Sequence, residues 1–520
     1  MSVRSRWLGL VPYDEAEALQ RAIHEHADAD YLLLQEHPHV YTLGSSAKPE
    51  HVLRDPATVG AALVHADRGG DVTYHGPGQL VGYPIISLAE WRAGQRDVVA
   101  YVRKLEDVLI AVCADFGITA ARSAGYTGVW VGDEKIAAIG VRVSRGRTRH
   151  GFALNVDPDL SMFEHIVPCG IRDRGVTSMA RVLGHPVEMR TVVDRVVVRF
   201  GEAFACDADP EAGDRQDVAW QRRVTPTEGV EVALTSKRPE WMRVRARFDD
   251  GYLELKRLTQ KLDLHTVCEE AGCPNIYECW ADRTATFMIN GDRCTRACGF
   301  CQVDTRKPLA LDVDEPQRVA DAVVSLGLAH AVITCVARDD LADGGASGFA
   351  ATVDAIRATS PGTAVELLIA DCKGDGAALA TIFAARPDVL NHNLETVARL
   401  QRTVRPSAGY ARSLAVLARA RAAGLVTKSG LILGLGETDA EVRAAMTDLR
   451  AVGVELLTIG QYLRPSADHL PVVKWWHPDE FAALAAYGES LGFAHVASGP
   501  LVRSSYHARE GADRLVSAPH

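Results

Sequence analysis

The chain has 520 residues and a formal net charge of −10, with 47% hydrophobic and 24% charged residues. This length is too great for one typical core, so two or more domains are expected. The acidic balance lacks the basic face that nucleic-acid binding requires, and no stretch is apolar for long enough to form a signal peptide or a membrane span. The composition therefore predicts a globular, cytosolic protein that binds neither nucleic acid nor membrane.

Residues 1–206 predict a mixed α/β domain. The runs YLLLQ, GVWVG, KIAAIGVRV and GFALNV are typical of short strands, and DVVAYVRKLEDVLIAVCADFG has apolar residues at helical spacing up to Gly117. GVWV and KIAAIGVRV predict a hairpin whose turn is Gly132-Asp133-Glu134. Lys135 is then expected at the start of the second strand, close to the turn.

Two loops of this domain are candidates for chemistry. The segment DRGGDVTYHGPGQLVGYPI (67–85) is rich in glycine, which lets a backbone approach a ligand closely, although a plain cluster of turns has the same composition. Cys169 lies between a proline and a glycine, so a reachable loop position is expected. Its thiol becomes nucleophilic as the thiolate, which a neighbouring cation favours. The candidate cations are Lys135, His75, His150 and His165.

Residues 207–238 predict a linker. The periodicity of apolar residues is lost after Phe204, and the segment that follows is polar and rich in turn residues. It separates the first domain from a second domain at residues 239–520.

Six of the 11 cysteines fall in one short segment of the second domain. They are Cys268, Cys273, Cys279, Cys294, Cys298 and Cys301. Such clustering in a long cytosolic chain indicates a metal site rather than a disulfide scaffold. The second triplet, CTRACGFC, has no fourth thiol, and three thiolates on a cluster of four irons leave one iron open to a small molecule. A zinc site is the alternative, and its fourth ligand would have to come from elsewhere.

From Ala329 onward, strand-like runs alternate with helical ones. Repeated βα units predict a parallel sheet, either open and doubly wound or a full or partial barrel. Functional residues are expected at the C-terminal ends of its strands. The segment GLILGLGET does not have the spacing of the dinucleotide fingerprint, so no nicotinamide site is expected there.

CTRACGFC resembles the signature of radical S-adenosylmethionine (SAM) enzymes. With CEEAGCPNIYEC, DLADGGA, LNHNLETVARLQRTVRP, IGQYLRPSADHLPV and ASGPLVRSSYHA, it resembles lipoyl synthase over about residues 237–515. The resemblance implies a radical SAM partial (β/α) barrel with parallel strands, S-adenosyl-L-methionine, two 4Fe-4S clusters, and insertion of two sulfurs into a protein-bound octanoyl chain. It assigns one cluster to Cys294, Cys298 and Cys301, and an auxiliary cluster to Cys268, Cys273, Cys279 and Ser504, with Ser505 as second choice for the serine.

The sequence departs from that family in TCVARDDL and LLIADCKGD. Serine, aspartate, proline and phenylalanine are expected where Cys335, Ala337, Ala370 and Cys372 stand, which leaves the cofactor contacts at these strand ends open. Because cysteine is among the most buried residue types, Cys335 and Cys372 are expected to pack as small hydrophobes and not to bind metal.

Four motifs of the first domain, RGGDVTYHGPGQL, KIAAIGVRV, HGFALNV and PCGIRDRGVTSM, resemble the octanoyltransferases of lipoate biosynthesis over about residues 5–200. The resemblance implies an α/β fold like that of the biotin and lipoate protein ligases. It also implies that Cys169 takes octanoyl from acyl carrier protein as a thioester, with Lys135 favouring its thiolate, and passes it to a lysine. It assigns the acyl pocket to Arg68, Gly69, Gly70, Asp71, Val72, Thr73, Tyr74, His75, Ala138, Ile139, Gly140, Gly151, Phe152 and Ala153.

Together the resemblances predict a bifunctional enzyme that octanoylates lipoyl carrier domains and then inserts two sulfurs. Expected partners are octanoyl acyl carrier protein, the carrier domains of glycine cleavage H protein and of 2-oxoacid dehydrogenase E2 subunits, and a reduced electron donor. One alternative is a radical methylthiotransferase acting on tRNA, which the acidic charge disfavours. Another is a sulfur-inserting enzyme whose first domain only docks carriers.

The segment RVSRGRTRH (142–150) holds four arginines and a histidine in an otherwise acidic chain. It is a candidate surface for steering acidic carriers to Cys169 by long-range attraction. A solvated hairpin tip is the alternative interpretation.

Overall fold

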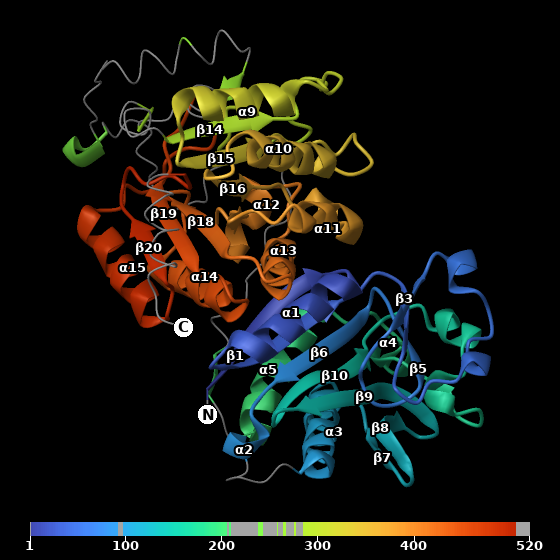
Figure 1. Cartoon of the computed structure of the whole chain (residues 1–520). Helices are drawn as coiled ribbons and strands as arrows, with labels where there is room; N and C mark the ends of the chain where they lie inside the picture. The colour runs from blue at the N-terminus through green and yellow to red at the C-terminus, as the bar shows by residue number, and fades with distance from the viewer. Residues whose placement is uncertain are drawn as a thin grey trace. The chain divides into compact units, whose positions relative to one another are not determined.

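The computed structural model describes residues 2–91, 97–204, 207–209, 238–242, 257, 264–266, 275–276 and 284–505. Contacts divide the chain into two compact units, Met1–Arg215 and Gln216–His520, a boundary that falls inside the range predicted as linker. Each unit has its own sheet (Figure 1). Each also has its own hydrophobic core.

The first unit mixes helices and strands, as its sequence predicts. In chain order its elements are β1 (Ser2–Leu10), α1 (Tyr13–His26), β2 (Asp30–Glu36), β3 (Val40–Leu43), β4 (Ala62–His65), β5 (Val72–His75), β6 (Gln79–Ile85), α2 (Leu88–Trp91), α3 (Val98–Asp115), β7 (Ala121–Ser123), β8 (Tyr126–Val131), β9 (Glu134–Ser144), β10 (Arg147–Asn155), β11 (Gly175–Val176), α4 (Met179–Leu183), α5 (Met189–Phe204) and β12 (Asp207–Asp209).

The main sheet of this unit has the strand order β12-β1-β2-β6-β10-β9-β8-β7, with β11 paired to β9, and a smaller sheet has the order β4-β3-β5. β8 and β9 form the predicted antiparallel hairpin, which places Lys135 at the start of β9. β12 pairs with β1, so the first sheet extends into the range predicted as linker.

One face of the main sheet is closed by α3 and α5. Apolar residues recur every three or four positions along both helices, for example at Leu105, Leu109 and Val112 of α3, and they pack on Leu80 and Leu154 of the sheet. The Asp97 side chain accepts a hydrogen bond from the Ala100 N–H and so caps the start of α3. α1 lies on the other face (Figure 1).

The second unit alternates strands and helices. Its elements are β13 (His265–Thr266), β14 (Thr284–Ile289), α9 (Glu315–Leu326), β15 (His330–Cys335), α10 (Ala346–Thr359), β16 (Ala364–Leu368), α11 (Gly376–Ala384), β17 (Val389–Asn391), α12 (Gln401–Val404), α13 (Tyr410–Ala422), β18 (Thr427–Leu433), α14 (Asp439–Ala451), β19 (Leu456–Gln461), α15 (Pro478–Ser490) and β20 (His495–Ser498).

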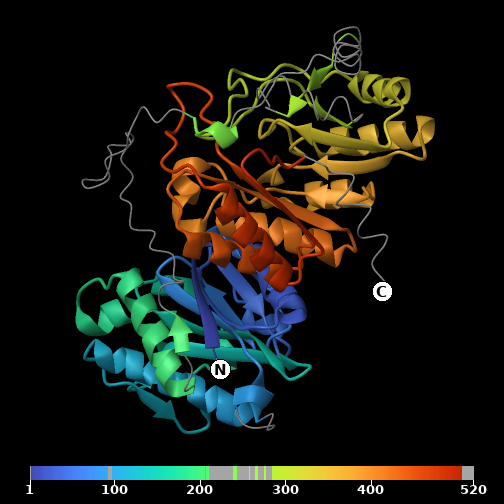
Figure 2. The ribbon, with the colours of Figure 1, turned by 90° about the vertical axis from the view of Figure 1, so that its left-hand side faces the viewer.

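The strands from β14 to β20 are neighbours in chain order and every pair is parallel, while β13 joins β14 antiparallel. The colours of Figure 2 follow this order from yellow through orange to red. Parallel strands in sequential order bring their C-terminal ends to one rim, where loops carry functional residues. This arrangement agrees with the predicted partial (β/α) barrel.

Among the described helices, none is both long enough and apolar enough to cross a membrane.

Candidate active sites

A cavity of about 560 Å³ lies in the first unit, among β5, β6, β9, β10 and the loop that carries Cys169. The predicted site residues that line it are Cys169, Lys135, Arg68, Gly69, Gly70, Asp71, Thr73, His75, Ala138, Ile139, Gly140, Gly151, Phe152 and Ala153. Segments that are far apart in the sequence therefore meet around one space.

The strand register explains why these segments meet. β9 and β10 are antiparallel, with Ala138 opposite Ala153 and Gly140 opposite Gly151. The Gly69 N–H donates to the Val141 carbonyl, and a methyl group at Gly140 would come within 2.9 Å of the Gly69 oxygen. Glycine at position 140 is thus required for the close approach of the glycine-rich loop to β9.

Val72 and Tyr74 were predicted to line the acyl pocket, but they are not among its lining residues. Both are fully buried in a separate apolar cluster with Phe163. The cause is the alternation of side chains along β5, which turns Thr73 and His75 toward the cavity and their neighbours away from it.

Cys169 lies in the single turn η4 (Pro168–Gly170) with a left-handed backbone, φ 55° and ψ 20°. A non-glycine residue in this region is strained, and such strain is common at functional sites. Farther along the same loop, β11 pairs with the start of β9, and the Thr177 N–H donates to the Lys135 carbonyl. The fold thereby ties the Cys169 loop to Lys135.

Two cationic side chains line the cavity. Lys135 is buried, with its Nζ 4.8 Å from the centre of the Trp130 ring. Arg68 is also buried, and among the described residues its hydrogen bonds go to neutral acceptors only, the Gly69 carbonyl and both oxygens of Thr42. Burial lowers the pKa of Arg68, and the nearby Tyr13, Cys169, Tyr83 and Asp71 raise it. A buried cation whose described hydrogen bonds all go to neutral acceptors suits a site where negative charge develops.

The histidines near the cavity differ from these cations. Burial lowers the pKa of His75 well below its ordinary value, and it lowers that of His150 against the opposing effect of Asp67. His75 bonds to Gln79 Oε1 at 2.7 Å, and His150 Nε2 lies 2.7 Å from Asp67 Oδ1. His165 is not among the lining residues. The cations that remain to favour a Cys169 thiolate are Lys135 and Arg68.

The cavity also has polar side chains outside the predicted acyl pocket, and partners that position its carboxylate. Tyr13 and Tyr83 line it from α1 and β6, and the Tyr83 hydroxyl lies 2.9 Å from His37 Nε2. Asp71 Oδ2 accepts a hydrogen bond of 2.6 Å from His51 Nδ1. No motif contains these partners, because α1 and the segment around His51 are far from the glycine-rich loop in sequence.

Two of the four arginines in the basic segment 142–150 are held by contacts within the first unit. Arg147 binds the carbonyls of Ala27 and Ala29 and lies 3.5 Å from Asp30, while Arg149 pairs with Asp67. Arg142 and Arg145 are exposed. A docking role can therefore concern Arg142 and Arg145, and an Arg147 substitution would disturb the fold instead.

The second candidate site is the loop 291–304, which follows β14 at the C-terminal rim of the parallel sheet. Neighbouring rim segments hold it: the Thr295 N–H donates to the Ala337 carbonyl, and the Gly299 N–H donates to the Val404 carbonyl. Arg296 makes two bonds of 2.8 Å to the Asp339 carboxylate and one of 2.6 Å to Asp371. The loop backbone is thus fixed independently of its thiols.

Cys294, Cys298 and Cys301 all lie on this loop, half-buried, and each has a free thiol. The pKa of Cys301 is raised to about 11, chiefly by burial and in smaller part by the Cys298 and Cys294 thiols, so the three are close enough to interact. No set of three or more His, Cys, Asp or Glu side chains at single-ion spacing occurs in the described part of the chain. A multi-iron cluster needs no such set, because each thiolate binds a different iron, so the donors present fit a cluster with one open iron.

Cys335 and Cys372 pack as predicted. Cys372 is buried in the core of the second unit and Cys335 packs against this core. Burial raises the pKa of each thiol to about 12. The Ala337 carbonyl accepts a hydrogen bond from the Thr295 hydroxyl, which helps to hold the cysteine loop.

Cys268, Cys273 and Cys279 lie outside the described residues. Between them, Asn275 is described, and its Nδ2 donates to the Leu501 carbonyl at 2.6 Å. Ser504 lies three residues beyond Leu501, and its Oγ accepts a hydrogen bond of 3.2 Å from Asn393. Asn275 therefore contacts the segment that carries Ser504 and Ser505.

Comparisons with known proteins match both units. The family model of the lipoyl protein ligase A/B catalytic domain matches residues 12–201, and that of the radical SAM superfamily matches residues 288–449. Both matches agree with the fold class predicted for their part of the chain.

Curated relatives are found as well. The lipoyl synthase of Mycobacterium avium (strain 104) is 60% identical over 272 residues, which are 52% of this chain and 89% of that protein. The lipoyl synthase of Mycobacterium tuberculosis (strain ATCC 25618 / H37Rv) is 59% identical over 272 residues, 52% of this chain and 88% of that protein. Lipoate-protein ligase A bound with ATP, a solved structure, has 19% identity and a TM-score of 0.36, covering 40% of this chain and 88% of that chain.

Proposed function

Because the chain belongs to the lipoyl synthase family and also contains a lipoyl protein ligase A/B catalytic domain, we propose that it catalyses two successive steps of protein lipoylation. The first unit transfers octanoyl from acyl carrier protein to a lysine of a lipoyl carrier domain. The second unit then inserts two sulfurs into the octanoyl chain. Glycine cleavage H protein and 2-oxoacid dehydrogenase E2 subunits are the proposed sources of the carrier domain, and a reduced donor supplies electrons.

One observation carries the first step: Cys169, Lys135 and the glycine-rich loop converge on a single cavity. The Cys169 thiolate attacks the donor thioester, so one thioester replaces another, and the target amine then converts the enzyme thioester into a more stable amide. Lys135 and Arg68 favour the thiolate and offset the negative charge that develops on the carbonyl oxygen.

The second step is proposed from the loop of Cys294, Cys298 and Cys301, which would hold a 4Fe-4S cluster with one iron open to S-adenosylmethionine. The cluster and S-adenosylmethionine, when both are bound there, would supply the one-electron chemistry that activates C–H bonds. Arg296 holds this loop to Asp339 and Asp371, which keeps the three cysteines at the rim of the sheet. The contact of Asn275 with Leu501 supports an auxiliary cluster held by Cys268, Cys273, Cys279 and Ser504.

Two measurements test this function. Mass spectrometry of the chain after incubation with octanoyl acyl carrier protein should find an octanoyl adduct on the peptide that contains Cys169. After anaerobic reconstitution, about eight irons per chain are expected for two clusters. An adduct elsewhere or no adduct would refute the transfer step, and zinc or no more than about four irons would refute the two-cluster assignment.

A further inference from the structure

We propose that Asp71, oriented by His51, receives the ammonium group of the target lysine when the acyl chain leaves Cys169. This inference rests on the proposed octanoyl transfer and names the side chains that bind its second substrate. It also separates two roles within the cavity, because Lys135 and Arg68 serve the thiolate and the carbonyl oxygen.

The Asp71 carboxylate is fixed by three donors. Its Oδ2 accepts from His51 Nδ1 at 2.6 Å, and its Oδ1 accepts from the N–H groups of Val72 at 2.7 Å and Lys48 at 3.3 Å. Both side chains of the His51–Asp71 pair are only 11% exposed. A carboxylate held in this way presents its remaining lone pairs in a constant direction.

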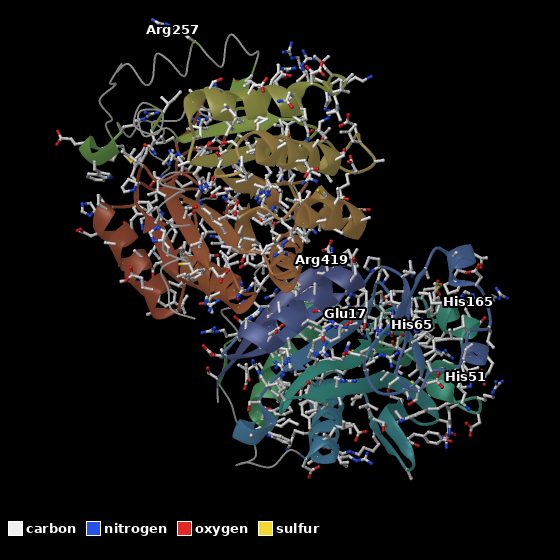
Figure 3. All side chains as sticks on the ribbon, in the orientation of Figure 1. Glu17, His51, His65, His165, Arg257 and Arg419 are labelled. Carbon is white, nitrogen blue, oxygen red and sulfur yellow. The ribbon has the colours of Figure 1, made fainter. Side chains whose placement is uncertain are left out.

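The pair lies against the residue that follows the nucleophile. A methyl group at Gly170 would come within 2.9 Å of Asp71 Oδ2 and 3.3 Å of His51 Cε1. The Val167 N–H donates to the His51 carbonyl at 2.8 Å, and the Leu53 N–H donates to the His165 carbonyl at 2.8 Å. Figure 3 shows His51 and His165 on these two neighbouring segments. Asp71 and Cys169 line the same cavity.

Charge selects Asp71 as the receiving group. A lysine side chain has an ordinary pKa of about 10.4, so it reaches the site as an ammonium ion. Lys135 and Arg68 repel it, and Asp71 is the one carboxylate among the described residues that line the cavity. An ammonium bound to Asp71 would lie beside the thioester on Cys169, positioned for attack once it loses a proton.

The step balances without a further reactant. The amine nitrogen forms a bond to the acyl carbon as the bond from that carbon to the Cys169 sulfur breaks. The nitrogen loses two protons, of which one goes to the departing sulfur and one to solvent. No atom is oxidised or reduced.

The experiment compares two nucleophiles on the octanoylated full-length enzyme at neutral pH. One is the lysine of a lipoyl carrier domain, and the other is hydroxylamine, which is neutral under these conditions and needs no anionic receptor. Asp71→Asn should slow discharge to the lysine about 10- to 100-fold, the range expected for one hydrogen bond to a charged group. In the same variant, discharge by hydroxylamine, measured on enzyme that is already octanoylated, should slow much less, so the ratio of the lysine rate to the hydroxylamine rate should fall about 10- to 100-fold. The rate of acyl-enzyme formation is measured alongside.

Matched variants separate this role from a structural one. Asp173→Asn removes the same charge from an exposed position on the Cys169 loop, outside the cavity lining, and should leave all three rates unchanged. His51→Asn keeps a hydrogen-bond donor for Asp71, and His51→Phe does not. Discharge to the lysine should therefore be slow in His51→Phe and close to the wild-type rate in His51→Asn.

Equal slowing with lysine and hydroxylamine would make the pair a structural clamp and overturn the inference. Unchanged discharge to lysine in Asp71→Asn would overturn it as well. A wild-type enzyme that forms no acyl adduct at all would refute the proposed transfer itself, which is a different failure.

Discussion

The acyl cavity of the first unit and the cysteine loop of the second differ in how far folding alone completes them. In the cavity, Cys169, Lys135, Arg68 and Asp71 are already placed by strand pairing and by the turn at Gly170. In the loop, Arg296 and backbone hydrogen bonds fix the chain, and the Cys294 sulfur accepts a hydrogen bond of 3.4 Å from the Arg296 N–H, but the metal that the thiols would bind has to come from outside the chain.

The difference follows from the chemistry that each site serves. Covalent transfer uses protein groups only, so the fold can orient all of them in advance. At a cluster site the fold only places the donor atoms. The free energy of metal binding then orders the site further, and the thiols lose their protons as they bind. The raised pKa of Cys298 and Cys301 agrees with thiols that remain protonated until metal binds.

The largest expected effect comes from Cys169→Ser. Octanoyl transfer should fall by more than roughly 10³-fold because the thioester intermediate cannot form. Sulfur insertion into a carrier that is already octanoylated should be unchanged. Separate assays of the two steps check this, and transfer near the wild-type rate would remove Cys169 from its role.

Cys298→Ala should have the opposite pattern. Loss of one of three thiolates should abolish the radical step and lower the iron content by about four per chain, while octanoyl transfer stays within two-fold of wild type. Removal of metal with a chelator should act in the same way. Transfer that fails along with the iron would show that the first site depends on the cluster.

Lys135→Met tests the preorganised charge of the cavity. Without this cation the negative charge on the Cys169 sulfur and on the developing carbonyl oxygen is less well offset, so transfer should fall about 10- to 100-fold. The rate of transfer is the measurement. A rate near that of wild type would leave Arg68 as the cation that matters.

Both units should lose stability in acid through buried histidines, among them His37 of the first unit, together with His75 and His150, and His392 of the second. Burial lowers the pKa of His37 and of His392 to about 4, against about 6.5 when unfolded. Between these values the unfolded chain binds more protons, so the free energy of unfolding falls as pH drops from 6.5 to 4, by up to about 3 kcal/mol per histidine. Urea unfolding at several pH values checks this. His37→Gln should reduce the dependence of the free energy of unfolding on pH in the first unit and leave that of the second unit unchanged. An unchanged pH dependence of the first unit would contradict this expectation.

The smallest effect concerns carrier steering. Arg145 is exposed at the turn between β9 and β10, so Arg145→Glu should raise the KM for an acidic carrier about two- to five-fold at low salt and little at high salt. Stability should be unaffected, unlike in Arg147→Glu, which loses buried contacts. A KM that does not move at low salt would identify the segment as an ordinary hairpin tip.

Much of both units followed from local patterns in the sequence. The alternation of strands and helices after Ala329 predicted the parallel sheet, and the hairpin around Asp133 placed Lys135 correctly. Val72 and Tyr74 do not line the cavity, because a strand alternates its faces and a continuous motif is therefore not a continuous surface.

Other features depend on contacts between distant segments. His51 meets Asp71 only because strands β3 and β5 pair and the segment 49–54 folds against 165–167. The sequence does not reveal that Arg68 is a buried cation, because its hydrogen-bond partners, Thr42 and Gly69, are neutral. Local spacing cannot report such juxtapositions, which arise from tertiary packing.

The most direct test of the account follows the mass of one carrier domain over time. The reconstituted full-length enzyme is given octanoyl acyl carrier protein, S-adenosylmethionine and a reductant. The account predicts that the carrier first gains octanoyl and that this species then becomes the lipoyl form with two added sulfurs, with Cys169→Ser blocking the first conversion only. An enzyme with a full complement of iron that never converts an octanoylated carrier, or one that lipoylates the carrier with Cys169 replaced, would contradict it.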